Sequence, residues 1–369
     1  MSKASELANL IGNINAGGGG VNRNLMINGA MNVAQRGTSV ASLVDTSGYK
    51  TCDRWFFNVY SGTFTQSQSS DSPDGFGNSI KLDCTAAETP GAADQTALYQ
   101  HMEGQNLQAI KKGTSEAKPL VASFWVKSTV TGTACVELVD NDSAHRTNSQ
   151  SYTINSANTW EYKTVTFPPD TGGSTMDDDN ASSMYFAFWL VAGANYKSGS
   201  LQTSWGAINN ANRAVGQTIN IGSSTDNNFY LTGVQLEIGQ NPTEFEHETF
   251  ERTIAKCQRY YFHTYGYGHQ PQTYGWSFNQ SYNGMIHLIG TGNYGMATFY
   301  QFPVEMRASP TVYLKGHAGT NARITYWNGS ETTYSSANVN SRQLTGFNLG
   351  ATSATEDYYS CGGVFEAEL

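Results

Sequence analysis

The stretch PLVASFWVKS, residues 119–128, places an apolar side chain at Leu120 and at every second position after it as far as Val126. Of the side chains between them, Val121 is apolar, whereas Ser123 and Trp125 are polar or amphipathic. A period of two is that of a β-strand with one buried face and one face toward water. SIKLDC, residues 79–84, shows the same alternation. These two stretches predict strands that each contribute one side to a core.

Similar strand patterns fill the chain from Asn22 to Gly239. The further candidates are TCDRWFFNVY (51–60), TACVELVD (133–140), WEYKTVTFP (160–168), MYFAFWLVAG (184–193) and NNFYLTGVQLEIG (227–239). Turn-forming stretches such as DSPDGFGN and DTGGS separate them. Many short strands between such turns favour an all-β sandwich over an α/β fold. We expect one helical interruption, at residues 103–113, ended by Gly113.

The N-terminus has a helical pattern instead. Four apolar residues follow the a and d spacing of a coiled coil: Ala4, Leu7, Ile11 and Ile14. A helix this short is marginal alone in water. We therefore expect it to anchor the chain to another protein or to self-associate, followed by a flexible joint at Gly17–Gly20. The alternative is a frayed terminus.

A second helix is expected near residue 250, where one face of ETFERTIAKCQRYYF is apolar. Its stripe consists of Phe250, Ile254, Cys257 and Tyr261. After it the composition shifts toward Tyr and Gly, and strand patterns resume. The expected parts are an N-terminal helix and linker (1–21), a β-sandwich (22–245), a connecting helix (246–262) and a C-terminal β-sandwich (263–369).

Composition excludes several classes of protein. The 369 residues carry a net charge of −9, which disfavours a nucleic-acid binder. Aromatic residues make up 12%, which is unlike a disordered chain. No apolar run approaches the roughly 18 residues of a membrane span, so we expect no membrane insertion. The five scattered cysteines suit buried thiols in a protein that folds in a reducing cytoplasm.

Two groups of aromatic residues could recognise sugars, because aromatic faces stack on C–H surfaces while amides and hydroxyls bind the sugar oxygens. The candidates are Tyr265, Tyr267, His269, Tyr274, Trp276 and Tyr282, and further on Tyr326, Trp327 and Tyr334. The alternative is that these rings fill the core and subunit contacts of the C-terminal domain. A rival surface is a loop with Tyr196, Trp205, Asn209 and Asn210.

The acidic runs are weak metal candidates. Asp177, Asp178 and Asp179 could supply oxygen ligands to calcium, and Asp140 with Asp142 forms a second cluster. Solvated acidic turns are the alternative. The histidines show no zinc spacing, and no nucleophile elbow occurs. We therefore expect no cofactor, no catalytic residues and no enzymatic activity.

Several of these stretches resemble virion proteins of tailed bacteriophages. NLMINGAMNVAQRGTS (24–39) and CDRWFF (52–57) are similar to the opening of β-sandwich modules in tail-fibre proteins of marine and cyanobacterial phages. The resemblance continues through FWVKS, FWLVAG, LQTSWG, NRAVGQ, FYLTGVQLEIG, FEHETFERTIAKCQRYY and FPVEMRASPTV. It implies a jelly-roll sandwich like that of carbohydrate-binding modules, in which the opening N-L-x-x-N-G segment lies close to the closing V-Q-L-E strand.

The resemblance also implies a structural and adhesive function, without catalytic residues. We expect a homotrimeric tail fibre, assembled in the host cytoplasm and attached to other virion proteins through its N-terminus. Its receptor would be a polysaccharide or protein of the host surface. Trimerisation would multiply weak contacts. The alternatives are a capsid fibre or decoration protein without a specific receptor, and a carbohydrate-binding module of a hydrolase.

Overall fold

The computed structural model describes residues 2–15, 22–142, 145–265, 267, 286–289, 296–315, 324–327, 331–334, 338–351 and 358–369. In several of the C-terminal strands only the backbone is described. The chain divides into two compact units. The first unit comprises residues 1–32, 38–249 and 369, and the second comprises residues 33–37 and 250–368. No sequence pattern marked the segment 33–37 as part of the second unit.

Helix α1 spans Lys3–Asn15 and begins with a capping contact, in which the Ser5 N–H donates to the Ser2 hydroxyl (3.3 Å). Leu7 is 57% exposed and Ile11 is 50% exposed. Ala4 is exposed too, whereas the side chain of Ile14 is outside the described part. Leu7 and Ile11, the two large apolar side chains of the expected stripe whose exposure is described, are therefore uncovered. Among the described helices, none combines the length and the apolar character that crossing a bilayer requires.

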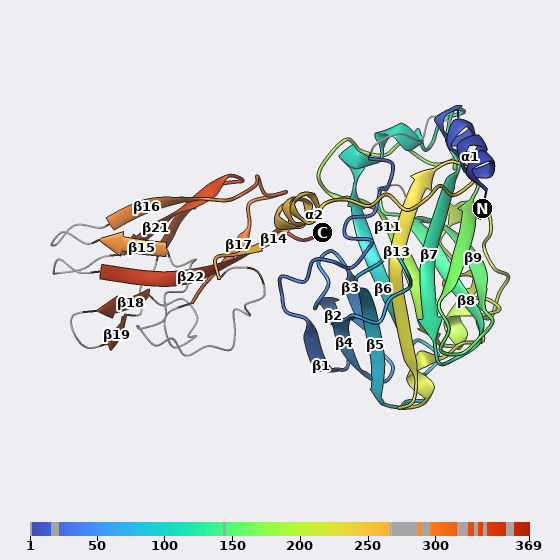
Figure 1. The fold of residues 1–369 in the computed structure, drawn as a ribbon, viewed down its shortest axis with the longest axis horizontal. Helices are drawn as coiled ribbons and strands as arrows, with labels where there is room; N and C mark the ends of the chain where they lie inside the picture. The colour runs from blue at the N-terminus through green and yellow to red at the C-terminus, as the bar shows by residue number, and fades with distance from the viewer. Residues whose placement is uncertain are drawn as a thin grey trace. The chain divides into compact units, whose positions relative to one another are not determined.

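The first unit is a sandwich of two antiparallel sheets (Figure 1). The six-stranded sheet has the order β1 (Ser39–Leu43), β4 (Thr63–Ser69), β5 (Ser79–Ala86), β13 (Asn228–Ile238), β7 (Leu120–Ser128) and β10 (Glu161–Phe167). The seven-stranded sheet has the order β12 (Gly206–Ala207), β9 (Arg146–Ile154), β8 (Gly132–Asp140), β11 (Ser182–Ala192), β6 (Gln95–Glu103), β3 (Phe56–Val59) and β2 (Thr46–Tyr49). The expected all-β sandwich class is confirmed.

Alternate side chains of both sheets meet in one core. Phe124 on β7 packs edge-on against Phe188 on β11, with ring centroids 5.0 Å apart. Phe186, two residues before Phe188, lies 4.8 Å from it and is fully buried as well. The alternation seen in residues 119–128 therefore marks the inward face of β7. Two sheets joined in this way leave every other side chain on an outward face.

The opening segment lies against the closing strand β13, as the resemblance implied. The Leu25 N–H donates to the Leu236 carbonyl (2.8 Å), and the Asn24 side chain donates to the Val234 carbonyl (3.1 Å). At Gly29 an added Cβ would lie 2.1 Å from the Val234 carbonyl oxygen. Asn28 accepts from the buried Trp55 indole (3.2 Å). The N-L-x-x-N-G residues thus close the sandwich rather than face a ligand.

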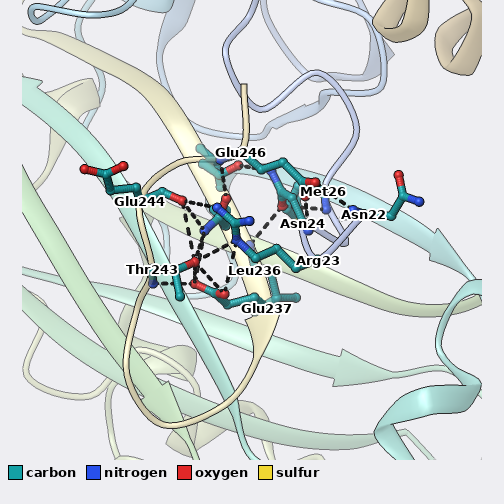
Figure 2. A network of polar contacts seen from close by, with 11 residues as sticks. Asn22, Arg23, Asn24, Met26, Leu236, Glu237, Thr243, Glu244 and Glu246 are labelled. Carbon is teal, nitrogen blue, oxygen red and sulfur yellow. Dashed lines mark hydrogen bonds and ion pairs between the residues drawn. The ribbon is translucent and has the colours of Figure 1, made fainter. Parts of the chain in front are cut away.

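A polar network fixes the same segment to the chain beyond β13 (Figure 2). Arg23 donates to the Thr243 hydroxyl and to the Glu244 carbonyl, both at 2.7 Å. Thr243 donates in turn to the buried Glu237 carboxylate (2.7 Å from its N–H). The Glu246 carboxylate accepts hydrogen bonds from the backbone N–H groups of Asn22 and Asn24. The network therefore couples the start of the sandwich to its end.

Asp140 is not part of a solvated acidic turn, which corrects that expectation. It is fully buried and pairs with Lys112, whose Nζ lies 2.7 Å from its Oδ2. Lys112 Nζ also lies 3.6 Å from Asp170 and donates to the Ser174 carbonyl (2.9 Å). Arg146 binds Asp170 through two hydrogen bonds of 3.0 and 2.8 Å. The buried charges therefore form one compensated network.

The helical interruption expected at residues 103–113 is present in 3-10 form. The structure has two 3-10 turns there, η1 (Gly104–Asn106) and η2 (Gln108–Ile110). Lys111 follows with a left-handed φ of 53°. This reversal directs the chain so that Lys112 enters the interior and reaches the buried carboxylates.

The second unit is also β-rich. One sheet contains β14 (Tyr261–His263), β15 (Ile286–Ile289), β17 (Thr311–Lys315), β18 (Ile324–Trp327), β19 (Glu331–Tyr334) and β22 (Tyr358–Glu366). The other contains β16 (Met296–Gln301), β20 (Asn338–Arg342) and β21 (Gly346–Ala351). Helix α2 spans only Phe250–Gln258, shorter than expected. Tyr261 was expected at the end of the apolar helical stripe. It lies in β14 instead, where it pairs with Glu366 at the end of β22.

Replacing Lys112 by methionine should destabilise the first unit strongly. The change leaves the buried Asp140 without its cation, which costs roughly 3–5 kcal/mol in the free energy of unfolding. Urea denaturation followed by tryptophan fluorescence measures the difference. Lys197→Met, at an exposed position, is the control. If Lys112→Met and the control unfold at the same urea concentration, the network does not stabilise the fold.

Candidate functional site

The outward side of the seven-stranded sheet carries a row of ring side chains. We call Tyr49, Phe56, Tyr99, His101 and Tyr185 the aromatic face. The neighbours of Phe56, Tyr99, His101 and Tyr185 along their strands are buried, so the pleat directs these four rings away from the core. Tyr49 lies on the same face because it pairs with Phe56. All five are partly exposed. The aromatic face is therefore open to solvent in part, unlike the rings between the sheets.

The five rings come from four adjacent strands. Tyr49 on β2 pairs with Phe56 on β3, and Phe56 pairs with Tyr99 on β6. The centroids of Tyr49 and Phe56 are 5.3 Å apart, and those of Phe56 and Tyr99 are 6.0 Å apart. Tyr185 on β11 lies 5.4 Å from Tyr99 and 5.3 Å from His101. Cross-strand contacts thus fix a continuous line of rings.

Two phenol groups in this line are held by donors. The Asn58 amide donates to the Tyr99 hydroxyl oxygen (3.4 Å), and Arg213 Nη2 donates to the Tyr185 hydroxyl oxygen (3.2 Å). Burial raises the pKa of both tyrosines above the ordinary value, so each keeps its proton at neutral pH. Their hydroxyl hydrogens find no acceptor among the residues that the structure describes.

Arg213 and Glu137 neutralise each other at the β8 end of the row. Glu137 is fully buried, and Arg213 Nε donates to its Oε2 (3.1 Å) while Nη2 pairs with its other oxygen. The guanidinium carbon also lies 5.0 Å from the centroid of the buried Trp189 ring. Ala187, between Tyr99 and Glu137 in the register, is small enough for Arg213 to reach the carboxylate. This pair holds Tyr185 in place without offering an uncompensated charge.

The segment 194–217 borders the aromatic face along β9. The Ser149 N–H donates to the Gln202 carbonyl (2.7 Å), and the Asn148 amide donates to the Thr203 carbonyl (3.0 Å). Arg213 belongs to this segment, so its pair with Glu137 fixes the segment to the sheet. Tyr49 on the edge strand β2 stands at the opposite end. The rings thus occupy a bounded strip of the sheet.

His101 is the titratable ring of the face. Burial, and after it the charge of Arg54, lowers its pKa to about 4. Its Nδ1 lies 2.9 Å from the Ser182 hydroxyl, and its carbonyl accepts from Arg54 (2.8 Å). At neutral pH the imidazole is therefore uncharged. It adds a further polar ring without adding charge.

The structure separates the two described members of the aromatic candidates expected in the second unit. Tyr265 is only 6% exposed and packs in a cluster with Tyr261 and Val364, which favours the core alternative for this residue. Tyr267 is 44% exposed; its hydroxyl accepts from the Ala34 N–H (3.1 Å), and its ring meets Phe250 edge-on.

The other candidates are not brought together by any described contact. His269, Tyr274, Trp276 and Tyr282 lie outside the described residues. Tyr326, Trp327 and Tyr334 are on described strands, β18 and β19, but their side chains are not described. Their role in receptor binding stays a prediction.

The rival loop is built mainly into the sandwich. The Trp205 indole donates to the Pro168 carbonyl (2.8 Å) and packs against the core. Asn209 caps η4 (Asn210–Asn212) through its side chain. Tyr196 lies 5.1 Å from Trp189 and 6.0 Å from Arg213, so it extends the ring-rich surface next to the aromatic face.

The acidic run Asp177–Asp179 is exposed, and its backbone ties it to the two 3-10 turns. The Gln105 N–H donates to the Asp179 carbonyl (2.9 Å), and the Gln108 amide donates to the Asp177 carbonyl (3.1 Å). Within the described ranges, no three His, Cys, Asp or Glu side chains are placed to hold a metal ion. The described carboxylates of this run therefore do not converge.

The aromatic face was missed in the sequence, although part of its signal is visible. In QTALYQHME (95–103), Leu98 and Met102 mark the core face, so Tyr99 and His101 must point outward. In MYFAFWLVAG every position is apolar or aromatic, and the alternation that would identify Tyr185 is absent. Pairing of β6 with β11 was needed to bring these rings together.

The comparisons with known proteins identify no family. No family model matches the chain, and no curated protein matches its sequence. The chain is similar to the enzymatically active domain of tailspike protein 4 of bacteriophage CBA120, at 15% identity and a TM-score of 0.29. That match covers 58% of this chain but only 21% of the tailspike chain.

Two sugar-related structures match a similar share of the chain. One is a putative sugar-binding protein from Bacteroides thetaiotaomicron (15% identity, 58% of this chain and 99% of that chain, TM-score 0.34). The other is a family 11 carbohydrate-binding module from Clostridium thermocellum (13% identity, 57% and 99%, TM-score 0.25). Similarity at this level does not transfer a ligand from one protein to another.

The stability of the first unit should fall on acidification because of His101. The folded pKa of about 4 lies below the ordinary 6.5, so the unfolded chain binds the proton first. The contribution of neutral His101 to the free energy of unfolding is of the order of 3 kcal/mol. It is fully present above pH 6.5 and is lost as the pH falls toward 4. Urea denaturation at pH 7.5 and pH 4.5 measures it.

His101→Gln should flatten this pH dependence, because glutamine does not titrate. His145→Asn, at an exposed position where the backbone φ is 48°, is the control and should keep the wild-type dependence. An unchanged dependence in His101→Gln would mean that this imidazole is not held neutral by the face.

Proposed function

We propose that this protein binds carbohydrate through the aromatic face. The observation that carries the proposal is the line of five partly exposed rings on four strands, with two phenols held by Asn58 and Arg213 so that they can donate. Sugars present C–H surfaces that stack on rings and hydroxyls that accept such hydrogen bonds. This combination fits a sugar chain lying across the strands.

The charges near the rings favour a neutral glycan. Arg213 and Glu137 are buried and paired with each other, and His101 is uncharged at neutral pH. An acidic polysaccharide would need an exposed cation to pair with its carboxylates. The rings and hydroxyls instead suit a neutral hexose or pentose chain.

The wider role that we propose is adhesion by a non-catalytic virion protein, a phage tail fibre that contacts the host surface as a homotrimer. The resemblance of the sequence motifs to tail-fibre modules supports this role. The uncovered Leu7 and Ile11 of α1 also support it, because an apolar helical stripe is stabilised by packing on copies of itself or on a virion protein. Three weak sites on one fibre bind a surface by avidity.

The aromatic face is tested by affinity electrophoresis of the full chain in native gels. The gels contain hydroxyethyl cellulose, laminarin, xylan, galactan or galactomannan. We expect at least one polysaccharide to retard the protein. Tyr99→Ala and Tyr185→Ala should each weaken that binding roughly tenfold, the effect of losing one ring with its hydrogen bond.

Tyr60→Ala is the matched control, because Tyr60 is 44% exposed, follows β3 and lies outside the face. If every polysaccharide retards Tyr99→Ala and Tyr185→Ala as strongly as it retards the Tyr60→Ala control, or if none retards the wild-type chain, the proposal is contradicted. Release of reducing ends from the retarding polysaccharide would show a hydrolase and contradict the non-catalytic role.

The trimer is tested by sedimentation equilibrium. Three copies of the 40.1 kDa chain give a mass of about 120 kDa. Leu7→Glu with Ile11→Glu should reduce it to the monomer mass, because the charges prevent helix packing, while Glu6→Gln should not. A wild-type monomer, or a trimer that persists in the double variant, contradicts association through α1.

A further inference from the structure

The opposite face of the sandwich has its own cluster of aromatic side chains. Trp125 on β7 pairs with Tyr162 on the edge strand β10, and their ring centroids are 5.4 Å apart. Phe124 and Val126, on either side of Trp125, are core residues, so Trp125 points outward from the six-stranded sheet. Tyr162 is 38% exposed, and Trp125 is partly exposed. Neither ring is needed to fill the core.

A second pair of rings lies two residues further along the same sheet. Trp160 meets Tyr230 on β13 with centroids 6.1 Å apart, and both are partly exposed. Tyr230 pairs with Lys127, whose Nζ lies 4.4 Å from the Tyr230 ring and 5.4 Å from the Trp160 ring. Trp125 and Lys127 are on the same side of β7. The four rings thus occupy neighbouring rows of one sheet face.

Asp71 holds this second pair in place. Its Oδ1 accepts from the Trp160 indole N–H (3.0 Å), and its Oδ2 pairs with Lys127. The Asp71 side chain is nevertheless 44% exposed. An ionised carboxylate offers about four lone-pair positions, and these two donors use only half of them. The remaining positions suit two adjacent hydroxyl groups of a ligand.

The backbone is also shaped around these rings. At Gly233, with a left-handed φ of 61°, an added Cβ would lie 2.7 Å from the Phe76 ring and 3.1 Å from the Trp125 ring. The register between β13 and β7 shifts at this residue. A bulge with glycine therefore lets the Trp125 indole approach the strand closely. The rings are held before any ligand arrives, which lowers the entropy cost of binding.

We propose that Trp125, Tyr162, Trp160 and Tyr230, together with Asp71, form a second carbohydrate-binding platform. Its ligand is a neutral sugar whose ring stacks on the indoles and whose vicinal hydroxyls donate to Asp71. Lys127 is compensated by Asp71, so the platform does not select an anion. It lies on the six-stranded sheet and is independent of the aromatic face on the seven-stranded sheet. One copy of the chain then has two sugar sites, one on each side of the sandwich.

The test uses the full chain carrying Tyr99→Ala and Tyr185→Ala, which removes two rings of the aromatic face together with both of its bound phenol groups. Affinity electrophoresis with the five polysaccharides named above is combined with quenching of tryptophan fluorescence, to which Trp125 and Trp160 contribute among the seven tryptophans of the chain. We expect this double variant to keep binding to at least one polysaccharide. Adding Tyr162→Ala, Trp160→Ala or Asp71→Asn should weaken the remaining binding roughly tenfold each.

Thr164→Ala is the matched control, since Thr164 is exposed on the same side of β10 two residues after Tyr162. Thermal melting identifies any variant that fails to fold, and Tyr162→Ala, at the most exposed ring, keeps the test open if Trp160→Ala is unstable. The proposal is overturned if the chain without the aromatic face binds none of the polysaccharides. It is also overturned if Tyr162→Ala and Asp71→Asn bind as the control does.

These outcomes separate the two proposals. If the wild-type chain is retarded and only the aromatic-face substitutions weaken the retardation, the first site is supported and the second is contradicted. If only the substitutions at Tyr162, Trp160 and Asp71 matter, the second stands and the first falls. If no polysaccharide retards the wild-type chain, both are contradicted.

Discussion

Packing of the two sheets through rings such as Phe124 and Phe188 is the constraint on which the first unit depends. Once alternate side chains of β7 and β11 are committed to the core, the intervening ones must point away from it. Tyr185 and Trp125 therefore stand on opposite outer faces because of how their neighbours pack. The same pleat that buries the core produces both ring-bearing surfaces.

Buried charges are used to position structure rather than to meet a ligand. Glu137 fixes Arg213 and, through it, the hydroxyl of Tyr185. Lys112 compensates the buried Asp140 next to the two 3-10 helices. Arg23 and Glu246 join the first residues of the sandwich to the last. Because these charges are compensated inside, the outer faces can present rings and hydroxyls with little net charge.

Sequence patterns were sufficient for the fold but only partly for the site. The alternation in residues 119–128 predicted β7 because its apolar positions Leu120, Phe124 and Val126 all face the core. The helical interruption expected at 103–113 is present as two 3-10 helices, and the left-handed Lys111 follows them just before Lys112, which pairs with Asp140. The many aromatic residues near Tyr265 predicted a sugar-binding site in the second unit, yet Tyr265 is buried.

The residues of the aromatic face lie far apart in the chain and become neighbours only through strand pairing. Phe56, Tyr99 and Tyr185 come from three stretches separated by more than forty residues, and no local pattern reveals their register. Conversely, the motifs that resemble phage fibre modules, such as Asn24 and Gly29, serve closure of the sandwich. The sequence motifs therefore indicated the residues that close the sandwich more clearly than the residues on its surface.

Nuclear magnetic resonance with ¹³C-labelled tyrosine rings, titrated with a polysaccharide that retards the chain, tests the central claim most directly. We expect the resonances of Tyr49, Tyr99 and Tyr185 to shift together as the sugar is added, because these rings belong to one contact surface. Shifts confined to tyrosines of the second unit, with these three unchanged, would contradict the assignment of the ligand to the outward side of the seven-stranded sheet.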